Sequence, residues 1–476
     1  LNQDAGLSLR IDADTASLTT PAFDIDRYVA PFVRLEWAPD CPAGARATLR
    51  FATDAHADFA ADRELPLPLA TDMPGRQFTH VPLYRHANRD GRLTRLRLTF
   101  SGARGGTLRI LGLVTACDTR PPLNNPCYLQ GCTEYYRWSG DRAFLTANLP
   151  RMRAALDFML REFRIADEGC VAVPWVGHDG KAGYDGKNII KGGGIGNNYW
   201  DLLPFGGHDC LATIYAYDAL RRMAQLEATV AEHPEWRLPP AKQTAAALGK
   251  LADDVRRRSQ QRFWHPTTGR FVACVDTDGR QHDYGYTFVN NEAVALGLAS
   301  DEQARSIQAW LSGQRTVAGD TSTGADIYHW RFGPRATTRR NVDWYTFAWS
   351  GPEAIPWGGQ VQDGGAVLGF AYHDLMARLH TAGPDDALRA LDRTLDWFAD
   401  IRAEGGYRAY YAKPGRGTLQ GGGPAGGLGM DQEFFESVLV PQVMLYGFLG
   451  LEPTADGFRL NPRLPSGWPS LRIDHI

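Results

Sequence analysis

The residues best suited to chemistry are acidic side chains in Gly-rich, aromatic segments. Asp201 stands between Trp200 and Leu202 in GNNYWDLLPFGG, where apolar neighbours would desolvate its carboxyl group. Desolvation raises the pKa of a carboxyl group and favours the protonated form that a general acid needs. We therefore predict that Asp201 is a general acid, whereas the nearby Asp209 suits the N-cap of a helix beginning beside it.

A second carboxylate is predicted from two later segments. Asp431 and Glu433 stand in GGGPAGGLGMDQEFFESV at the start of an expected helix, where the helix dipole favours acids. The preceding glycines would let backbone approach a ligand, so we predict Glu433 as the general base, with Asp431 as the substitute. Asp363 in WGGQVQDGGAV is a third candidate, although its side chain would equally cap a helix over 364–380.

Aromatic and amide side chains near these acids could bind a sugar. The chain has 13 Trp, 18 Tyr and 51 Gly; aromatic rings can stack on the apolar faces of sugars, and amide and carboxylate groups bond hydroxyls. The predicted substrate-binding residues are Trp175, Asn198, Tyr199, Trp200, Asp326, Trp330, Trp344, Trp349, Trp357, Gln360, Gln362 and Gln420.

Other polar residues in these loops have structural interpretations. In GDTSTGADIYHWRFGPR, Asp320 is expected to buttress the loop through an arginine, and Asp326 could do so or line a subsite. In DYGYTFVNNEA, Asn291 is expected to cap a helix, and Asp283 could face the cleft.

Composition and motifs narrow the classes of partner. The 476 residues carry a net charge of −3, and no apolar run approaches the ~20 residues of a membrane span, so neither nucleic acid nor membrane is an expected partner. No P-loop, HExxH or EF-hand pattern occurs, so we predict no cofactor or metal ligands, although loop carboxylates could hold a structural Ca²⁺. The chain begins at Leu1 without a signal-like stretch, so a trimmed or mature product is expected. Compartment and oligomeric state stay open.

The elements that must position these residues fall into two kinds. Residues 1–117 alternate apolar and polar side chains in short runs such as FVRLEWA (32–38) and RLRLTF (95–100), which is typical of a jelly-roll-like β-sandwich. After the Pro/Asn-rich linker DTRPPLNNP the period becomes helical. The expected helices lie over 127–138, 148–163, 208–227, 243–264, 291–299, 301–312, 364–380, 388–401 and 434–449.

Long Gly-rich loops separate these helices, over 164–207, 313–363 and 403–431. Loops of this length in compact domains are usually functional. We therefore predict a mainly α catalytic domain over 118–450, an (α/α)6 toroid of helical hairpins whose long loops build one face. Residues 451–476 are expected to form a short β segment.

Three short motifs resemble those of the six-hairpin glycosidases, the group of α-L-rhamnosidases, glucoamylases, trehalases and disaccharide phosphorylases. DGFRLNPRLPSGWPSLRI is similar to their C-terminal signature, WGGQVQDGGAV to their Asn/Asp-Gly-Gly motif, and GNNYWDLLPFGG to the trehalase Trp-Asp loop. The resemblance implies Asp201 as general acid and a late-loop base, Glu433, Asp431 or Asp363. It also implies an inverting hydrolase, whose two carboxylates would stand ~6.5–9.5 Å apart around a water.

The residues are compatible with four functions. The first is an inverting, exo-acting glycosidase with a carbohydrate substrate. The second is a disaccharide phosphorylase of the same fold, with phosphate in place of water. It would need a cationic pocket, for which Arg335, Arg339, Arg340 and Arg416 are available. The third is a non-catalytic sugar-binding protein, and the fourth is a polysaccharide lyase on a similar toroid.

Overall fold

The computed structural model describes residues 6–25, 30–69, 75–86, 90–116, 121–173, 200, 203, 205–276, 279–340, 355–420, 426–430 and 435–474. The described residues up to 116 form one compact unit, and those from 121 onward form a second. None of the described helices is long and apolar enough to cross a lipid bilayer.

The first unit consists of two four-stranded antiparallel sheets that share one core. One sheet has the order β1 (Leu7–Arg10), β8 (Thr107–Ala116), β3 (Phe32–Asp40) and β6 (Gln77–Pro82). The other has the order β2 (Thr15–Thr19), β7 (Leu93–Ser101), β4 (Arg46–Thr53) and β5 (Glu64–Leu67), and two 3-10 turns, η1 (Ala61–Arg63) and η2 (Leu83–Arg85), lie between strands. Trp37 and Phe100, from different sheets, lie 6.2 Å apart in the core, as the period-two pattern predicted for a β domain.

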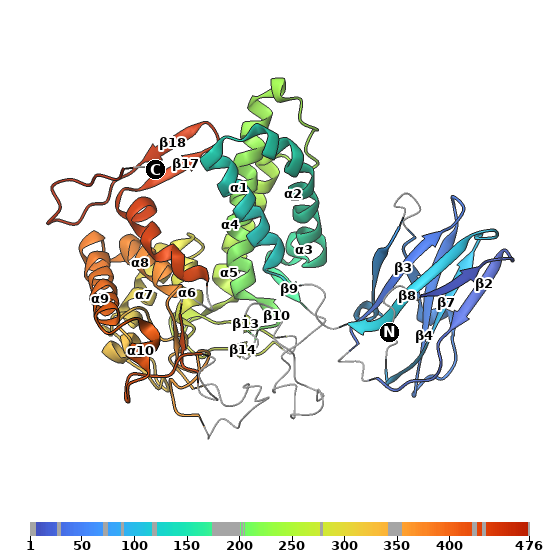
Figure 1. The fold of residues 1–476 in the computed structure, drawn as a ribbon, viewed down its shortest axis with the longest axis horizontal. Coiled ribbons are helices and arrows are strands. Elements are labelled where there is room, and N and C mark those ends of the chain that lie inside the picture. The colour runs from blue at the N-terminus through green and yellow to red at the C-terminus, as the bar shows by residue number, and fades with distance from the viewer. Residues whose placement is uncertain are drawn as a thin grey trace. The chain divides into compact units, whose positions relative to one another are not determined.

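The second unit is mainly helical, as predicted (Figure 1). Its helices are α1 (Asn124–Ser139), α2 (Arg142–Glu162), α3 (Ile165–Glu168), α4 (Cys210–Glu232), α5 (Ala245–Arg262), α6 (Thr287–Ala295), α7 (Asp301–Leu311), α8 (Phe370–Thr381), α9 (Pro384–Ala403) and α10 (Tyr407–Tyr411). Three 3-10 helices among the described residues of this unit are η3 (Pro234–Trp236), η4 (Gly324–Tyr328) and η6 (Phe435–Gln442), and η7 (Val443–Phe448) is a π-helix.

Helices far apart in the sequence pack in a closed succession. Helix α1 contacts α4, α4 contacts α6, α6 contacts α8, and α8 contacts η6 and η7. The succession closes because Tyr446 of η7 donates a hydrogen bond to Glu134 of α1 at 2.7 Å and receives one from Trp138 at 2.7 Å. Helices α2, α5, α7 and α9 pack on α1, α4, α6 and α8 respectively, and α7 also packs on α8.

Several predicted helices differ from the observed elements in their bounds: the helix predicted over 148–163 is α2, which begins at Arg142, and the one over 291–299 is α6, which spans Thr287–Ala295. Two others differ for local reasons. The predicted helix over 364–380 begins at Phe370, because Gly364 adopts φ +76° and the residues after it pair with the loop around Gly427. Within the predicted helix over 434–449, residues 435–448 form a 3-10 helix followed by a π-helical turn, since Pro441 lacks the N–H that an α-helix interior requires.

Short strands tie the loops of the helical unit together. They are β9 (Val171–Val173), β10 (Gly207–Asp209), β13 (Cys274–Val275) and β14 (Gln281–His282) in one sheet, and the pairs β11 (Trp264–His265) with β12 (Arg270–Phe271), β15 (Ala366–Val367) with β16 (Leu428–Gly429), and β17 (Leu451–Thr454) with β18 (Gly457–Leu460). After β18, Trp468 packs on Phe448 with ring centroids 5.2 Å apart, so the closing segment rests on the helical core.

Candidate active site

A cavity of about 270 Å³ lies where several helices of the closed succession begin. Its wall is formed by Asn124 of α1, Leu211 of α4, Glu292 of α6, Phe370 of α8, Leu439 of η6 and the loop residue Trp200. Three of these residues, from α1, α4 and α8, are the first or second residue of their helix. The positive ends of three helix dipoles therefore meet at this cavity and favour negative charge there.

Helix α4 is placed at the cavity by its N-cap. Strand β10 ends at Asp209, whose carboxylate accepts a hydrogen bond from the Ala212 backbone N–H at 2.9 Å. Asp209 is fully buried, so the helix start is fixed within the core. The predicted capping role of Asp209 is confirmed.

Trp200 forms a rigid part of the cavity wall. The centroid of its indole lies 5.0 Å from that of the Phe288 ring and 5.3 Å from that of the Phe370 ring. These two phenyl rings stack on each other with their centroids 4.7 Å apart. Only 2% of Trp200 is exposed, so its ring closes one side of the cavity and offers little open surface. Asp201, the predicted general acid, follows it directly in the chain and lies outside the described residues.

A carboxylate and an imidazole that the sequence analysis did not select line the same cavity. Glu292 Oε1 lies 3.7 Å from His373 Nδ1, and both side chains are largely buried. Burial lowers the pKa of His373 to about 4, against the opposing charge of Asp218, so the imidazole is neutral near pH 7. The contact is therefore one between a carboxyl group and a neutral ring, and not an ion pair at that pH.

The sequence contains one indication of a role for Glu292, which helical periodicity does not reveal. Residues 287–294 of α6 are all buried, including Asn290, Asn291 and Glu292. Polar side chains are rarely buried without a structural or functional partner. The run NNEA in an otherwise apolar segment was thus the available indication.

Those predicted binding residues of the two later loops that the structure describes belong to one loop assembly. The strands β15 and β16 pair in parallel, and Val361 N donates to Gly426 O at 2.9 Å. Gln420 belongs to the same assembly, because its backbone N donates to Leu428 O at 2.8 Å.

Arg335 is the centre of this loop assembly. Its guanidinium donates to Asp326 Oδ1 at 3.0 Å, to the Asp326 carbonyl at 2.9 Å and to the Gly364 carbonyl at 2.7 Å. It also lies 4.7 Å from the ring centre of Trp330 and 5.7 Å from that of Trp357. Burial raises the pKa of Asp326, but the bonds from Arg335 and Ser322 outweigh it and lower the pKa, so Asp326 is an ionised buttress.

Asp363 and its neighbours are held by local bonds. Asp363 is 4% exposed, and its Oδ2 lies 3.3 Å from Arg340 Nε. It does not cap a helix, since α8 begins seven residues later with no side-chain cap. The side chain of Gln360 accepts a bond from the backbone N–H of Gln362 at 2.6 Å, and both residues are buried.

A buried arginine holds the neighbouring loops in place. Arg270, fully buried, donates to Asp320 at 2.6 and 2.9 Å and to Asp283 at 2.7 Å. The predicted buttress role of Asp320 is confirmed, and Asp283, which could have faced the cleft, pairs with Arg270. Asn291 does not cap α6 but lies inside it and bonds Asp374.

The four arginines considered for a phosphate site each have a carboxylate partner. The pairs are Arg335 with Asp326 at 3.0 Å, Arg339 with Asp320 at 3.7 Å, Arg340 with Asp363 at 3.3 Å and Arg416 with Glu404 at 2.7 Å. Each of these cations is therefore offset by a nearby negative charge.

The remaining predicted site residues lie outside the part of the chain that the structure describes. They are the catalytic candidates Asp201, Asp431 and Glu433 and the binding candidates Trp175, Asn198, Tyr199, Trp344 and Trp349. Their roles stay predictions.

No family model matches this sequence, and no curated protein matches it. Among solved structures, a GH78 family rhamnosidase of Bacillus sp. GL1 is 13% identical with a TM-score of 0.38, covering 94% of this chain and 48% of that one. A rhamnosidase from Klebsiella oxytoca with rhamnose bound is 10% identical, with a TM-score of 0.35 and coverage of 92% and 88%. A sialidase is 9% identical, with a TM-score of 0.37 and coverage of 97% and 56%.

The chain thus spans about half the length of the first rhamnosidase and of the sialidase. All three TM-scores are below 0.5.

Proposed function

We propose that this chain is a glycoside hydrolase whose active site is the cavity lined by Trp200, Glu292 and His373. The main observation in support is that residues adjoining two predicted catalytic segments line the same cavity. Trp200, which directly precedes Asp201, forms one wall, and Leu439, in the helical segment that follows Asp431 and Glu433, forms another.

The proposed mechanism uses two carboxyl groups. Asp201 protonates the glycosidic oxygen, and Glu433, or alternatively Asp431, activates a water on the opposite face of the sugar. Asp363, the third candidate base, does not line this cavity. Three helix starts at the cavity favour the ionised form of a base. A base that activates water in this way yields an inverted anomer, and a pocket of about 270 Å³ suits exo-action on a chain end.

The helical unit supports an (α/α)6 toroid as its architecture. Helices α1, α4, α6 and α8 follow one another around the cavity, and α2, α5, α7 and α9 lie against them as hairpin partners. In the proposed toroid, η6 and η7 complete the inner ring, since η7 bonds back to α1.

Glu292 and His373 are proposed as substrate-binding residues. A neutral imidazole can donate one N–H and accept one bond, and the carboxyl group beside it accepts a bond from a sugar hydroxyl. Their 3.7 Å contact fixes both side chains before substrate enters.

The test is a panel of p-nitrophenyl glycosides, including the α-L-rhamnoside, incubated with the purified chain with and without inorganic phosphate. We expect release of nitrophenol and free sugar from at least one glycoside, at a rate independent of phosphate. A sugar 1-phosphate as product would identify a phosphorylase instead. Binding of sugars without cleavage of any glycoside or oligosaccharide would contradict an enzymatic role.

A further inference from the structure

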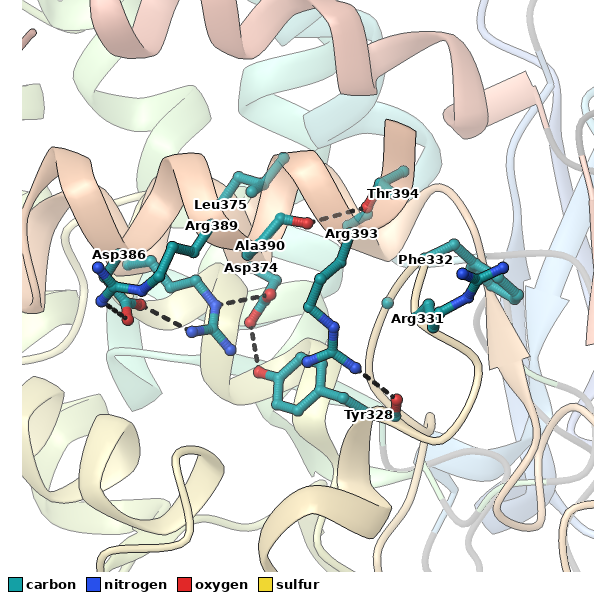
Figure 2. A pocket seen from close by; sticks show the side chains of 13 residues that line it. Tyr328, Arg331, Phe332, Asp374, Leu375, Asp386, Arg389, Ala390, Arg393 and Thr394 are labelled. Carbon is teal, nitrogen blue, oxygen red and sulfur yellow. Dashed lines mark hydrogen bonds and ion pairs between the residues drawn. The ribbon is translucent and has the colours of Figure 1, made fainter. Parts of the chain in front are cut away.

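A second cavity of about 280 Å³ lies on the other side of α8 from the candidate active site. It is bounded by α8, by α9 and by the turn after η4 (Figure 2). Among its lining residues, Asp374 directly follows His373 of the first cavity, so consecutive residues of one helix face the two cavities. Asp363, the one predicted catalytic residue within the described part of the chain, does not line this second cavity.

The charged lining of this cavity has an excess of cations. Among the residues that the structure describes, four arginines line it, Arg331, Arg378, Arg389 and Arg393, against two carboxylates, Asp374 and Asp386. The difference is 4 − 2 = +2, or +1 when Asp400, which pairs with Arg331 at 2.7 Å, is included. An anion entering the cavity would therefore meet net positive charge.

One arginine is held in place without a carboxylate. Arg378 lies between Asp374 at 3.0 Å and Asp386 at 2.7 Å, and Arg389 pairs with Asp386 at 2.9 Å. Arg393 donates from Nη2 to the Tyr328 carbonyl at 3.2 Å, as Figure 2 shows, and among the described residues no carboxylate lies within ion-pair distance of it. Its other N–H groups can face a ligand.

Two buried charged groups form part of the pocket, whereas Arg389 and Arg393 are exposed. Arg378 is 9% exposed and Asp374 is 4% exposed. Tyr328, whose hydroxyl donates to Asp374 at 2.7 Å, places its ring 4.8 Å from the Arg378 guanidinium and 6.0 Å from that of Arg393. Arg331 adopts φ +61°, a conformation that ordinary residues rarely hold without surrounding constraint.

We propose that this pocket binds an oxyanion, a phosphate or sulfate group, with Arg393 as the principal cation and Arg331 and Arg389 at its entrance. Guanidinium groups match the geometry of such oxygens with paired N–H donors, and bonds of this kind are stronger than neutral ones. The net charge of the lining and the uncompensated Arg393 are the features that select an anion over a neutral sugar.

The experiment is calorimetric titration of the whole chain with inorganic phosphate, sulfate and phenyl phosphate at fixed ionic strength. We compare wild type with Arg393→Gln and with Arg402→Gln, an exposed arginine of the same helix that does not line the cavity. Phenyl phosphate shows whether an ester-linked group enters as well as the free ion. Because binding is read as heat, the result does not depend on glycosidase activity.

We expect Arg393→Gln to weaken oxyanion binding at least about tenfold, which is the loss of one charge-assisted hydrogen bond, and Arg402→Gln to leave it unchanged. Arg389→Gln, at the exposed entrance, should weaken it less. Equal affinities for the Arg393 and Arg402 variants, or no binding of any of the three anions to the wild type, would overturn the proposal.

Discussion

Asn291 Nδ2 donates a hydrogen bond to Asp374 Oδ1 at 3.2 Å, and both residues are buried where α6 meets α8. Each stands beside a residue of the candidate active site, because Glu292 follows Asn291 and His373 precedes Asp374. This bond thus joins the two helices that carry the carboxyl–imidazole contact. Asp374 also accepts bonds from Tyr328 and Arg378, so one carboxylate connects α6, α8 and η4.

Replacing Asp374 by alanine should destabilise the helical unit by about 2–4 kcal/mol, because it leaves buried donors of Asn291, Tyr328 and Arg378 without their acceptor. Urea unfolding followed by circular dichroism measures the change. The exposed Asp392 of α9 provides a matched control, and Asp392→Ala should cost less than about 0.5 kcal/mol. A loss of unfolding free energy below about 1 kcal/mol for Asp374→Ala would show that the hydrogen bonds to Asp374 do not stabilise the helical unit as proposed.

The buried imidazole should make stability depend on pH. The pKa of His373 is lowered to about 4 in the fold, against about 6.5 in the unfolded chain, so the unfolded chain binds more protons between these values. The contribution of neutral His373 to the free energy of unfolding is complete above about pH 6.5. It falls by up to about 3 kcal/mol as the pH falls toward 4. His373→Gln should flatten the dependence of unfolding free energy on pH in this window.

The control for this pH experiment is on the same helix. His380 is half exposed, and His380→Gln should keep the wild-type pH slope between 4 and 6.5. If the His373 and His380 variants show the same slope as the wild type, the buried neutral state of His373 is wrong.

Glu292→Gln tests the binding role of the cavity carboxylate. The change keeps the side-chain shape but removes the charge, so we expect kcat/KM for the best substrate to fall about 10–100-fold, mainly through KM. Glu302→Gln, in the exposed first turn of α7, should leave kinetics unchanged. Wild-type kinetics for Glu292→Gln would remove this residue from the site.

Arg335→Lys should weaken the loop assembly, although charge is conserved. A lysine cannot reproduce the fork that bonds the carboxylate and carbonyl of Asp326 and the carbonyl of Gly364. We expect faster cleavage of the loops by thermolysin, which does not cut at basic residues, and about 1–3 kcal/mol lower stability. Unchanged proteolysis, matching that of an exposed Arg402→Lys control, would contradict the buttress role.

Local patterns in the sequence predicted much of the framework. Helical periodicity identified each long helix of the second unit, and the position of Asp209 before an apolar run identified a cap. The start of α8 was placed six residues early, because residues 364–369 take part in pairing with the loop around Gly427, more than 50 residues away. Local propensity contains no information about such pairing.

The candidate cavity depended on contacts that no local pattern shows. Glu292 and His373 belong to segments separated by 81 positions in the chain, and they meet because α6 packs on α8. The succession of helices closes through Tyr446 and Glu134, which are 312 positions apart. The sequence could therefore nominate acids by their neighbours, but it could not state which helix faces surround a common cavity.

The most direct measurement is kcat of Asp201→Asn on the methyl glycoside of the sugar that the nitrophenyl panel identifies. A methanol leaving group needs protonation, so loss of the general acid should lower kcat by about 10²–10⁴-fold, while the exposed Asp392→Asn control keeps wild-type activity. Circular dichroism spectra identical to the wild type would show that the fold is retained. Activity of Asp201→Asn within twofold of the wild type would contradict an active site at this cavity that works through Asp201.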